Sequence, residues 1–298
     1  DAVHTTIALT FLMSLICTVC AILLVPAFLH MMGTPKDVFN QSAVYLRIYF
    51  AGSMGLLFYN MGAGILRAVG DSRRPLYFLI FSALLNIGLD LFFVASLGLG
   101  VAGVAWATII SQGASAILIM AALSRETESY RVIWRKVRIN PVMTRKIFQI
   151  GLPSALQMAV TSFSNVFVQS YINHFGSAAM AGWSSYGKID KFCLLPIQSI
   201  SMGVTTFVGQ NLGARKLDRV KRSTRVGLMI CFGIALVIII PVWLAAGSLV
   251  RLFNQSPDVL SYGTLFVRLE MPFYFALCIN QIYAGTLRGV GNTKAPMV

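Results

Sequence analysis

The sequence contains few charged residues. Only 11% of its 298 residues are Asp, Glu, Lys or Arg, whereas 57% are hydrophobic and the mean hydropathy is +0.75. A soluble globular domain carries about 25% charged residues, so this composition excludes an ordinary soluble protein. Windows of about 20 residues, the length that crosses a bilayer, predict an all-α polytopic membrane protein. The eight predicted spans are roughly 8–31, 43–66, 76–97, 101–123, 147–173, 178–208, 225–250 and 259–286.

Residue types that build catalytic centres are also scarce. The three histidines, His4, His30 and His174, lie far apart at the ends of predicted spans. The sequence has no nucleophile elbow and no phosphate-binding loop. All five cysteines lie inside apolar spans, where thiols usually act as small hydrophobic groups. We therefore expect neither an enzyme nor a bound cofactor. A membrane-embedded transferase is an alternative, but it would need an acidic or histidine cluster at connections that are basic.

Acidic residues are rarer than basic ones, and the basic residues follow a pattern. Ten Asp and Glu stand against 24 Lys and Arg, which gives a net charge of +14. Eighteen of the 24 fall in alternate connections between spans, and the opposite connections are nearly bare. The positive-inside rule places the basic connections in the cytoplasm, and we expect a bacterial inner membrane. Because these cations follow the predicted topology, we expect no nucleic-acid partner.

The sequence repeats itself at one offset. The segment Leu66–Pro75 returns as Leu287–Pro296, 221 residues later, with the shared pattern Leu-Arg-x-Val-Gly. The same offset relates Arg47 to Arg268 and Asp37 to Asp258. Two copies of one unit in an apolar chain are typical of a secondary transporter.

The offset also predicts the domain organisation. We expect a truncated N-terminal lobe at 1–124, a cytoplasmic linker at 125–146 and a truncated C-terminal lobe at 147–298. If each unit is complete in the whole protein, about two spans are missing at each end and the total is twelve. Six spans per unit give both lobes the same orientation in the membrane, which predicts a parallel repeat.

Three motifs carry a family resemblance. They are Gly151-Leu152-Pro153 at the start of a span, the segment Gly209–Arg215 at the end of the next, and the two Leu-Arg-x-Val-Gly segments. Together they resemble the multidrug and toxic compound extrusion (MATE) family, over spans three to ten of twelve. The resemblance implies two six-helix lobes and an exporter of organic cations that is driven by Na⁺ or H⁺.

A coupled antiporter needs an acid inside the membrane, where a carboxylate is costly unless it is paired, neutralised or hydrated. Asp90, Asp190 and Glu270 lie at suitable depths in their spans. Asn86 precedes Asp90 by one turn, and an antiparallel helix pair would bring Thr108 to the depth of Asp90. These oxygen donors suit a hard cation, and the carboxylate could hold a proton instead. The trio resembles the family's coupling site; the alternative is hydrogen bonding between helices.

The second candidate group lies in the C-terminal half and includes Tyr186, Lys188, Asp190, Gln198 and Glu270. We interpret it as a substrate cavity or second coupling site. Lys188 and Lys191 are expected partners of Asp190, and Arg268 is the expected partner of Glu270. The alternative for Asp190 is a structural ion pair that holds a bent helix.

The function hypothesis is an H⁺- or Na⁺-coupled multidrug efflux antiporter that works by alternating access. Its expected partners are small organic cations and membrane lipids, and we expect a monomer. A flippase of lipid-linked saccharides is the closer alternative. Such a protein would need a large cationic cavity for the pyrophosphate group, whereas the middle of the predicted spans contains both acidic and basic residues.

Overall fold

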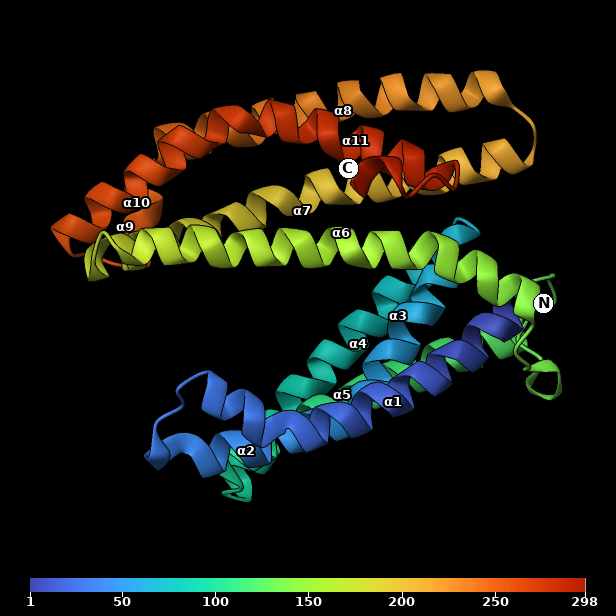
Figure 1. The fold of residues 1–298 in the computed structure, drawn as a ribbon, viewed down its shortest axis with the longest axis horizontal. Helices are drawn as coiled ribbons and strands as arrows, with labels where there is room; N and C mark the ends of the chain where they lie inside the picture. The colour runs from blue at the N-terminus through green and yellow to red at the C-terminus, as the bar shows by residue number, and fades with distance from the viewer. Residues whose placement is uncertain (298) are drawn as a thin grey trace. The chain divides into compact units, whose positions relative to one another are not determined.

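The computed structural model describes residues 1–297, which form helices and no strand. The chain divides into two compact units, unit 1 at Asp1–Ile147 and unit 2 at Phe148–Val298. This architecture confirms the predicted all-α fold class (Figure 1).

Unit 1 is built around helix α5. Its elements are α1 (Ala2–Met31), α2 (Lys36–Ala51), α3 (Ser53–Ala68), α4 (Arg73–Asp90), the π-helix η1 (Leu91–Ser96), α5 (Gly100–Arg125) and the short 3₁₀ helix η2 (Trp134–Lys136). Helix α5 packs against α2, α3 and α4, and α1 covers α2 and α3. Fully buried Leu66, Ile119 and Leu123 form its core. Val132 joins that core, so the segment predicted as a linker packs on unit 1.

Unit 2 is built around helix α7. Its elements are α6 (Pro141–Asn173), which begins in unit 1, α7 (Ser177–Gly213), α8 (Leu217–Leu244), α9 (Ala246–Arg251), α10 (Pro257–Glu270), the 3₁₀ helix η3 (Met271–Phe273), α11 (Tyr274–Gly289) and η4 (Ala295–Met297). Helix α7 packs against α8, α10 and α11. Ile197, Val208, Met271 and Ile282 form the core of this unit.

Five helices of the described chain are long and apolar enough to cross a membrane: α1, α4 with η1, α5, α7 and α8. The second and eighth predicted spans are each broken in the middle. The first break is at Gly52, where a Cβ atom would lie 2.3 Å from the Cβ of Ile109. The second break is η3, where Pro272 cannot donate a backbone hydrogen bond. A hydropathy window does not detect such breaks, because they change the backbone conformation while the side chains stay apolar.

The two breaks lie at equivalent positions of the repeat. Helices α3 and α11 have the same length, and each begins and ends 221 residues from its counterpart. The turns after them also match, because Gly70 and Gly291 have φ angles of 93° and 83°. The backbone amide that follows each glycine donates back to Leu66 or Leu287 over 2.9 Å. The structure therefore confirms the repeat at the level of backbone geometry.

Candidate functional site

A buried hydrogen bond sets the register of the two helices that carry the first candidate group. Ser82 on α4 donates to the backbone oxygen of Ser111 on α5 over 2.7 Å. Farther along, Phe93 in η1 lies beside Gly103 near the start of α5. Residue numbers fall on α5 as they rise on α4, so the two helices are antiparallel, as predicted.

Asn86 and Asp90 follow Ser82 by one and two turns on α4. The Asn86 Nδ2 and Asp90 Oδ1 atoms are both buried, and neither has a hydrogen-bond partner. Gln112 on α5 has a buried Oε1 atom in the same condition. Buried polar side-chain atoms nearly always have a partner, and leaving one without costs about 1–3 kcal/mol. Asp90 Oδ1 and Gln112 Oε1 are acceptors that can coordinate a cation, whereas Asn86 Nδ2 is a donor.

The contacts Ser82–Ser111 and Phe93–Gly103 place Thr108 at the level of residues 85–88 of α4. The hydroxyl of Thr108 donates to the backbone oxygen of Val104 over 2.9 Å, which leaves its lone pairs able to accept or coordinate. Its part in a site with Asp90 stays a prediction.

A π-helix begins immediately after Asp90. In η1 the amide of Leu97 donates to the oxygen of Phe92, five residues back, over 3.1 Å. Short π-helical segments widen a helix, and they occur frequently at functional sites. No proline or glycine interrupts residues 91–96, so the sequence contained no signal for this feature.

Asp190 has two tyrosine partners, and only one of them, Tyr186, was predicted from the sequence as a member of its group. Its Oδ1 atom accepts a hydrogen bond from Tyr186, one turn earlier on α7, over 3.2 Å. The same atom accepts a hydrogen bond from Tyr274 on α11. Both tyrosines are buried, with exposed fractions of 7% and 5%. This tyrosine–aspartate group joins two helices whose contacting residues are 84 positions apart in sequence.

The predicted ion pairs of the second group are wrong. Lys188 places its Nζ atom 5.0 Å from the ring centre of Phe253. Arg268 lies over the ring of Trp243, at 5.4 Å from its centre, and not against Glu270. None of the ion pairs among residues 1–297 involves Asp190, Glu270 or Lys191. Residues two apart on a helix point in different directions, which turns Lys188 away from Asp190.

The remaining members of the second group lie apart from the hydrogen bonds. Glu270 ends α10, one turn before Tyr274, and is exposed. It is close enough to interact electrostatically with Asp190 and Tyr186. Gln198 is exposed about two turns beyond Asp190 on α7. The structure thus brings Tyr186, Asp190 and Tyr274 together, with Glu270 nearby and Gln198 outside the group. In the sequence, the feature that links Tyr274 to this group is its position four residues after Glu270.

An ionic cluster holds the N-terminal end of α4, whereas Asp90 lies at its C-terminal end. The Arg74 side chain donates to Asp71 and to Glu126 at the end of α5. Asp71 also accepts the backbone amide of Arg73 over 3.0 Å, which caps the helix. Burial acts to raise the pKa of Asp71, but the hydrogen bonds and charge of Arg74 outweigh it and lower the pKa. The hydrogen bond from Arg74 also lowers the pKa of Glu126.

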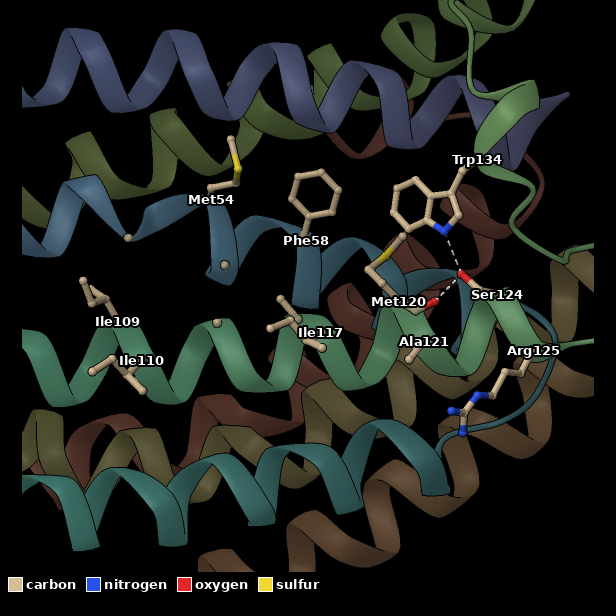
Figure 2. A pocket seen from close by; sticks show the side chains of 14 residues that line it. Met54, Phe58, Ile109, Ile110, Ile117, Met120, Ala121, Ser124, Arg125 and Trp134 are labelled. Carbon is tan, nitrogen blue, oxygen red and sulfur yellow. Dashed lines mark hydrogen bonds between the residues drawn. The ribbon is translucent and has the colours of Figure 1, made fainter.

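Each unit has an open cavity that does not include its candidate aspartate, Asp90 or Asp190. Helices α3 and α5 border a cavity of about 810 Å³, which is apolar except at one end (Figure 2). At that end Trp134 Nε1 donates to Ser124 Oγ over 3.1 Å. A cavity of about 610 Å³ lies between α7 and α8. Neither cavity is lined by Asp90 or Asp190. Residues 1–297 also contain no cluster of three or more His, Cys, Asp or Glu that could hold a metal ion.

Known proteins are similar to this chain in sequence and in fold. A family model described as MatE matches residues 1–92 and 153–298. The chain is 29% identical over 303 residues to "Probable multidrug resistance protein YoeA" of Bacillus subtilis. It is 27% identical over 268 residues to "Probable multidrug resistance protein NorM" of Thermotoga maritima. These alignments include 99% and 88% of this chain but 65% and 57% of those proteins, so the chain spans less than two thirds of either relative.

Solved structures agree with the sequence matches. "Crystal structure of MATE in the bent conformation" superposes with a TM-score of 0.92 at 24% identity, covering 99% of this chain and 66% of that one. A "MOP superfamily transporter from Pyrococcus furiosus" gives the same TM-score and coverage. At this identity the likeness shows the fold alone. The family model matches well over half of the sequence, and on that ground this chain belongs to the MATE family and is an integral membrane protein.

Proposed function

We propose that the full-length protein is a multidrug efflux antiporter that exports small organic cations in exchange for H⁺ or Na⁺. The observation that carries this proposal is the buried Asp90 Oδ1 atom, which has no hydrogen-bond partner. A carboxylate in a membrane helix needs a proton, a cation or a partner, and this one has an oxygen without a protein partner. The names of relatives such as YoeA and NorM support multidrug resistance as the biological role.

The coupling step follows from competition for Asp90. Occupation of the carboxylate by a cation or proton stabilises one arrangement of the transporter, and bound substrate stabilises the other. Each ligand shifts the equilibrium only by its difference in affinity for the two arrangements. The widened η1 segment directly after Asp90 is a place where such a change could enter α4. The tyrosine–aspartate group in unit 2 is proposed as the second site of proton or substrate binding.

The test is transport by the full-length protein in proteoliposomes. An imposed pH gradient or Na⁺ gradient drives efflux of an ethidium-like cation in the wild type, and which gradient works identifies the coupling ion. Asp90→Asn should lose that response, since an amide cannot exchange a proton or supply a negative charge. Asp258→Asn is the matched control, because Asp258 is an exposed acid in the first turn of α10. Equal gradient-driven efflux in Asp90→Asn and wild type would show the assignment to be wrong.

The same liposomes test the alternative function. A flippase of lipid-linked saccharides would move a labelled lipid of that class between leaflets and would not export the ethidium-like cation.

We also place the basic connections in the cytoplasm of a bacterial inner membrane. Labelling of single cysteines in intact cells tests this orientation: a cysteine near Arg219 should be protected from an impermeant reagent, and one in the connection near Asn254 should react.

A further inference from the structure

The cavity between α7 and α8 changes character along its length. On α8 its lining begins with Arg219 and Arg222 and continues with Val226 and Ile230. These residues are three or four apart, so they lie on one face of the helix. Phe207 of α7 forms part of the opposite wall. The groove therefore runs from a cationic end to an apolar end over about 16 Å, at about 1.5 Å per residue.

Glycine gives the groove its depth. At Gly203 no atom lies within 4 Å of the position that a Cβ would take, so this part of the lining is open. At Gly227 a Cβ would lie 2.6 Å from a methyl group of Val204, so the two helices are in close contact there. Beside this contact the apolar walls stay uncovered: Phe207, Val226 and Ile230 have exposed fractions of 45%, 41% and 49%.

Within residues 1–297, the cations at the mouth have no ion-pair partner. None of the ion pairs among residues 1–297 involves Arg219 or Arg222, and both side chains are exposed. The segment 215–225 contains six basic residues and a single acid, Asp218. Guanidinium groups match phosphate oxygens in geometry and charge. An anionic group bound at this end would meet two arginines, whereas an organic cation would be repelled.

The cavity between α3 and α5 provides an internal comparison. Its lining includes one arginine, Arg125, at the end where Trp134 and Ser124 are already hydrogen bonded to each other (Figure 2). It offers an apolar surface of similar kind but no pair of guanidinium groups. The combination of apolar groove and paired cations is found in the α7–α8 cavity and not in the α3–α5 cavity.

We propose that the α7–α8 groove binds one anionic phospholipid of the surrounding membrane. Its phosphate lies against Arg219 and Arg222, and one acyl chain follows the groove past Gly203 toward Ile230. Basic pockets between membrane helices on the cytoplasmic side are suited to such headgroups, and the proposed orientation puts this end of α8 on that side. A free phosphate ion would use the arginines but would leave the apolar wall uncovered, so the groove favours a lipid.

Lipid retention by the full-length protein tests the proposal, measured by native mass spectrometry with dioleoyl phosphatidylglycerol and dioleoyl phosphatidylcholine. The wild type should retain phosphatidylglycerol in preference. Arg219→Gln with Arg222→Gln should weaken that retention about 10- to 30-fold, since each basic residue at an anionic membrane surface contributes about 1 kcal/mol. Lys221→Gln with Arg225→Gln is the matched control: it removes the same charge from α8, but neither residue lines the groove.

A second pair of variants tests the apolar part. Gly203→Leu on α7 should fill the groove and reduce lipid retention several-fold. Gly233→Leu should not, because Gly233 is an open position on α8 that does not line the groove. Equal retention of the two lipids, or equal effects of both arginine pairs, would overturn the proposal. Displacement of the lipid by inorganic phosphate alone would show a free-anion site instead. If no lipid is retained and Gly203→Leu has no effect, another segment of the protein covers the groove and the proposal is wrong. The efflux assay on Asp90 is independent of all these outcomes.

Discussion

The aspartates of the two units differ in how their carboxylates are satisfied. Asp190 accepts hydrogen bonds from Tyr186 and Tyr274, and the second of these ties α7 to α11. Asp90 has a buried oxygen without a partner, and the amide one turn before it is likewise unpaired. A carboxylate that already holds two hydroxyl groups contributes to the fold, whereas one with a free oxygen has capacity for a ligand. We therefore predict that Asp90 exchanges the coupling ion, and that Asp190, the proposed second site, contributes less to coupling and more to positioning α7 against α11.

The repeated turns differ in a similar way. Both copies share the glycine with positive φ and the backbone hydrogen bond to a leucine. Only the first copy adds an ionic cluster, because Asp71 and Arg74 correspond to Asn292 and Ala295 in the second. The turns therefore share a backbone conformation that glycine allows, and the ion pairs of the cluster occur in unit 1 alone among the described residues.

The largest expected effect separates the two carboxylates in transport. Asp90→Asn should reduce gradient-driven efflux by tenfold or more, on the order of what loss of a coupling charge implies. Asp190→Asn should reduce it only a few-fold, because an amide oxygen still accepts the tyrosine hydroxyl groups. Initial efflux rates in proteoliposomes measure both. Equal losses in the two variants would remove the distinction between exchange and positioning.

Stability should show the opposite order. Asp190→Ala removes the carboxylate acceptor of both buried tyrosine hydroxyl groups, although Tyr274 keeps the backbone oxygen of residue 190 at 3.3 Å, and should cost about 1–3 kcal/mol; Tyr274→Phe should cost about 1 kcal/mol. Asp90→Asn should cost little, since Asp90 Oδ1 has no hydrogen bond to lose. Thermal unfolding of the full-length protein in detergent compares the three variants. A drop in melting temperature for Asp90→Asn as large as that for Asp190→Ala would contradict the structure.

The shared backbone of the turns predicts equal effects in both units. Gly70→Ala and Gly291→Ala place a side chain where φ is 93° and 83°. Each should destabilise its unit by about 1 kcal/mol or somewhat more, since L-residues pay this penalty in the left-handed region. The measurement is again thermal unfolding, with Gly64→Ala as a control within helix α3. A penalty at only one of the two glycines would mean that the turns are not equivalent.

The smallest expected effect concerns pH and the ionic cluster of unit 1. The folded-state pKa of Asp71 lies below its unfolded value, so its contribution is present above about pH 4 and is lost as pH falls through the folded pKa. Asp71→Asn should therefore cost about 0.5 kcal/mol at pH 7, the size of a partly exposed ion pair, and less at pH 3. Equilibrium unfolding at both pH values measures the difference. An effect that does not depend on pH would assign Asp71 a capping role alone.

The sequence by itself determined the apolar spans, the offset of the repeat and the glycine turns. Each of these depends on local properties: hydropathy over a window, the identity of residues at a fixed spacing, and the φ angle that only glycine adopts easily. It also identified Asn86 and Asp90, because two polar residues one turn apart on an apolar helix stand out in any register.

Only the tertiary structure decided which groups meet. Tyr274 reaches Asp190 from another helix, Lys188 turns to Phe253, and Arg268 lies over Trp243. The breaks in the second and eighth spans and the groove with Arg219 and Arg222 were likewise invisible to hydropathy. These features depend on the register and close approach of helices that are distant in sequence, and local residue preferences do not fix that register.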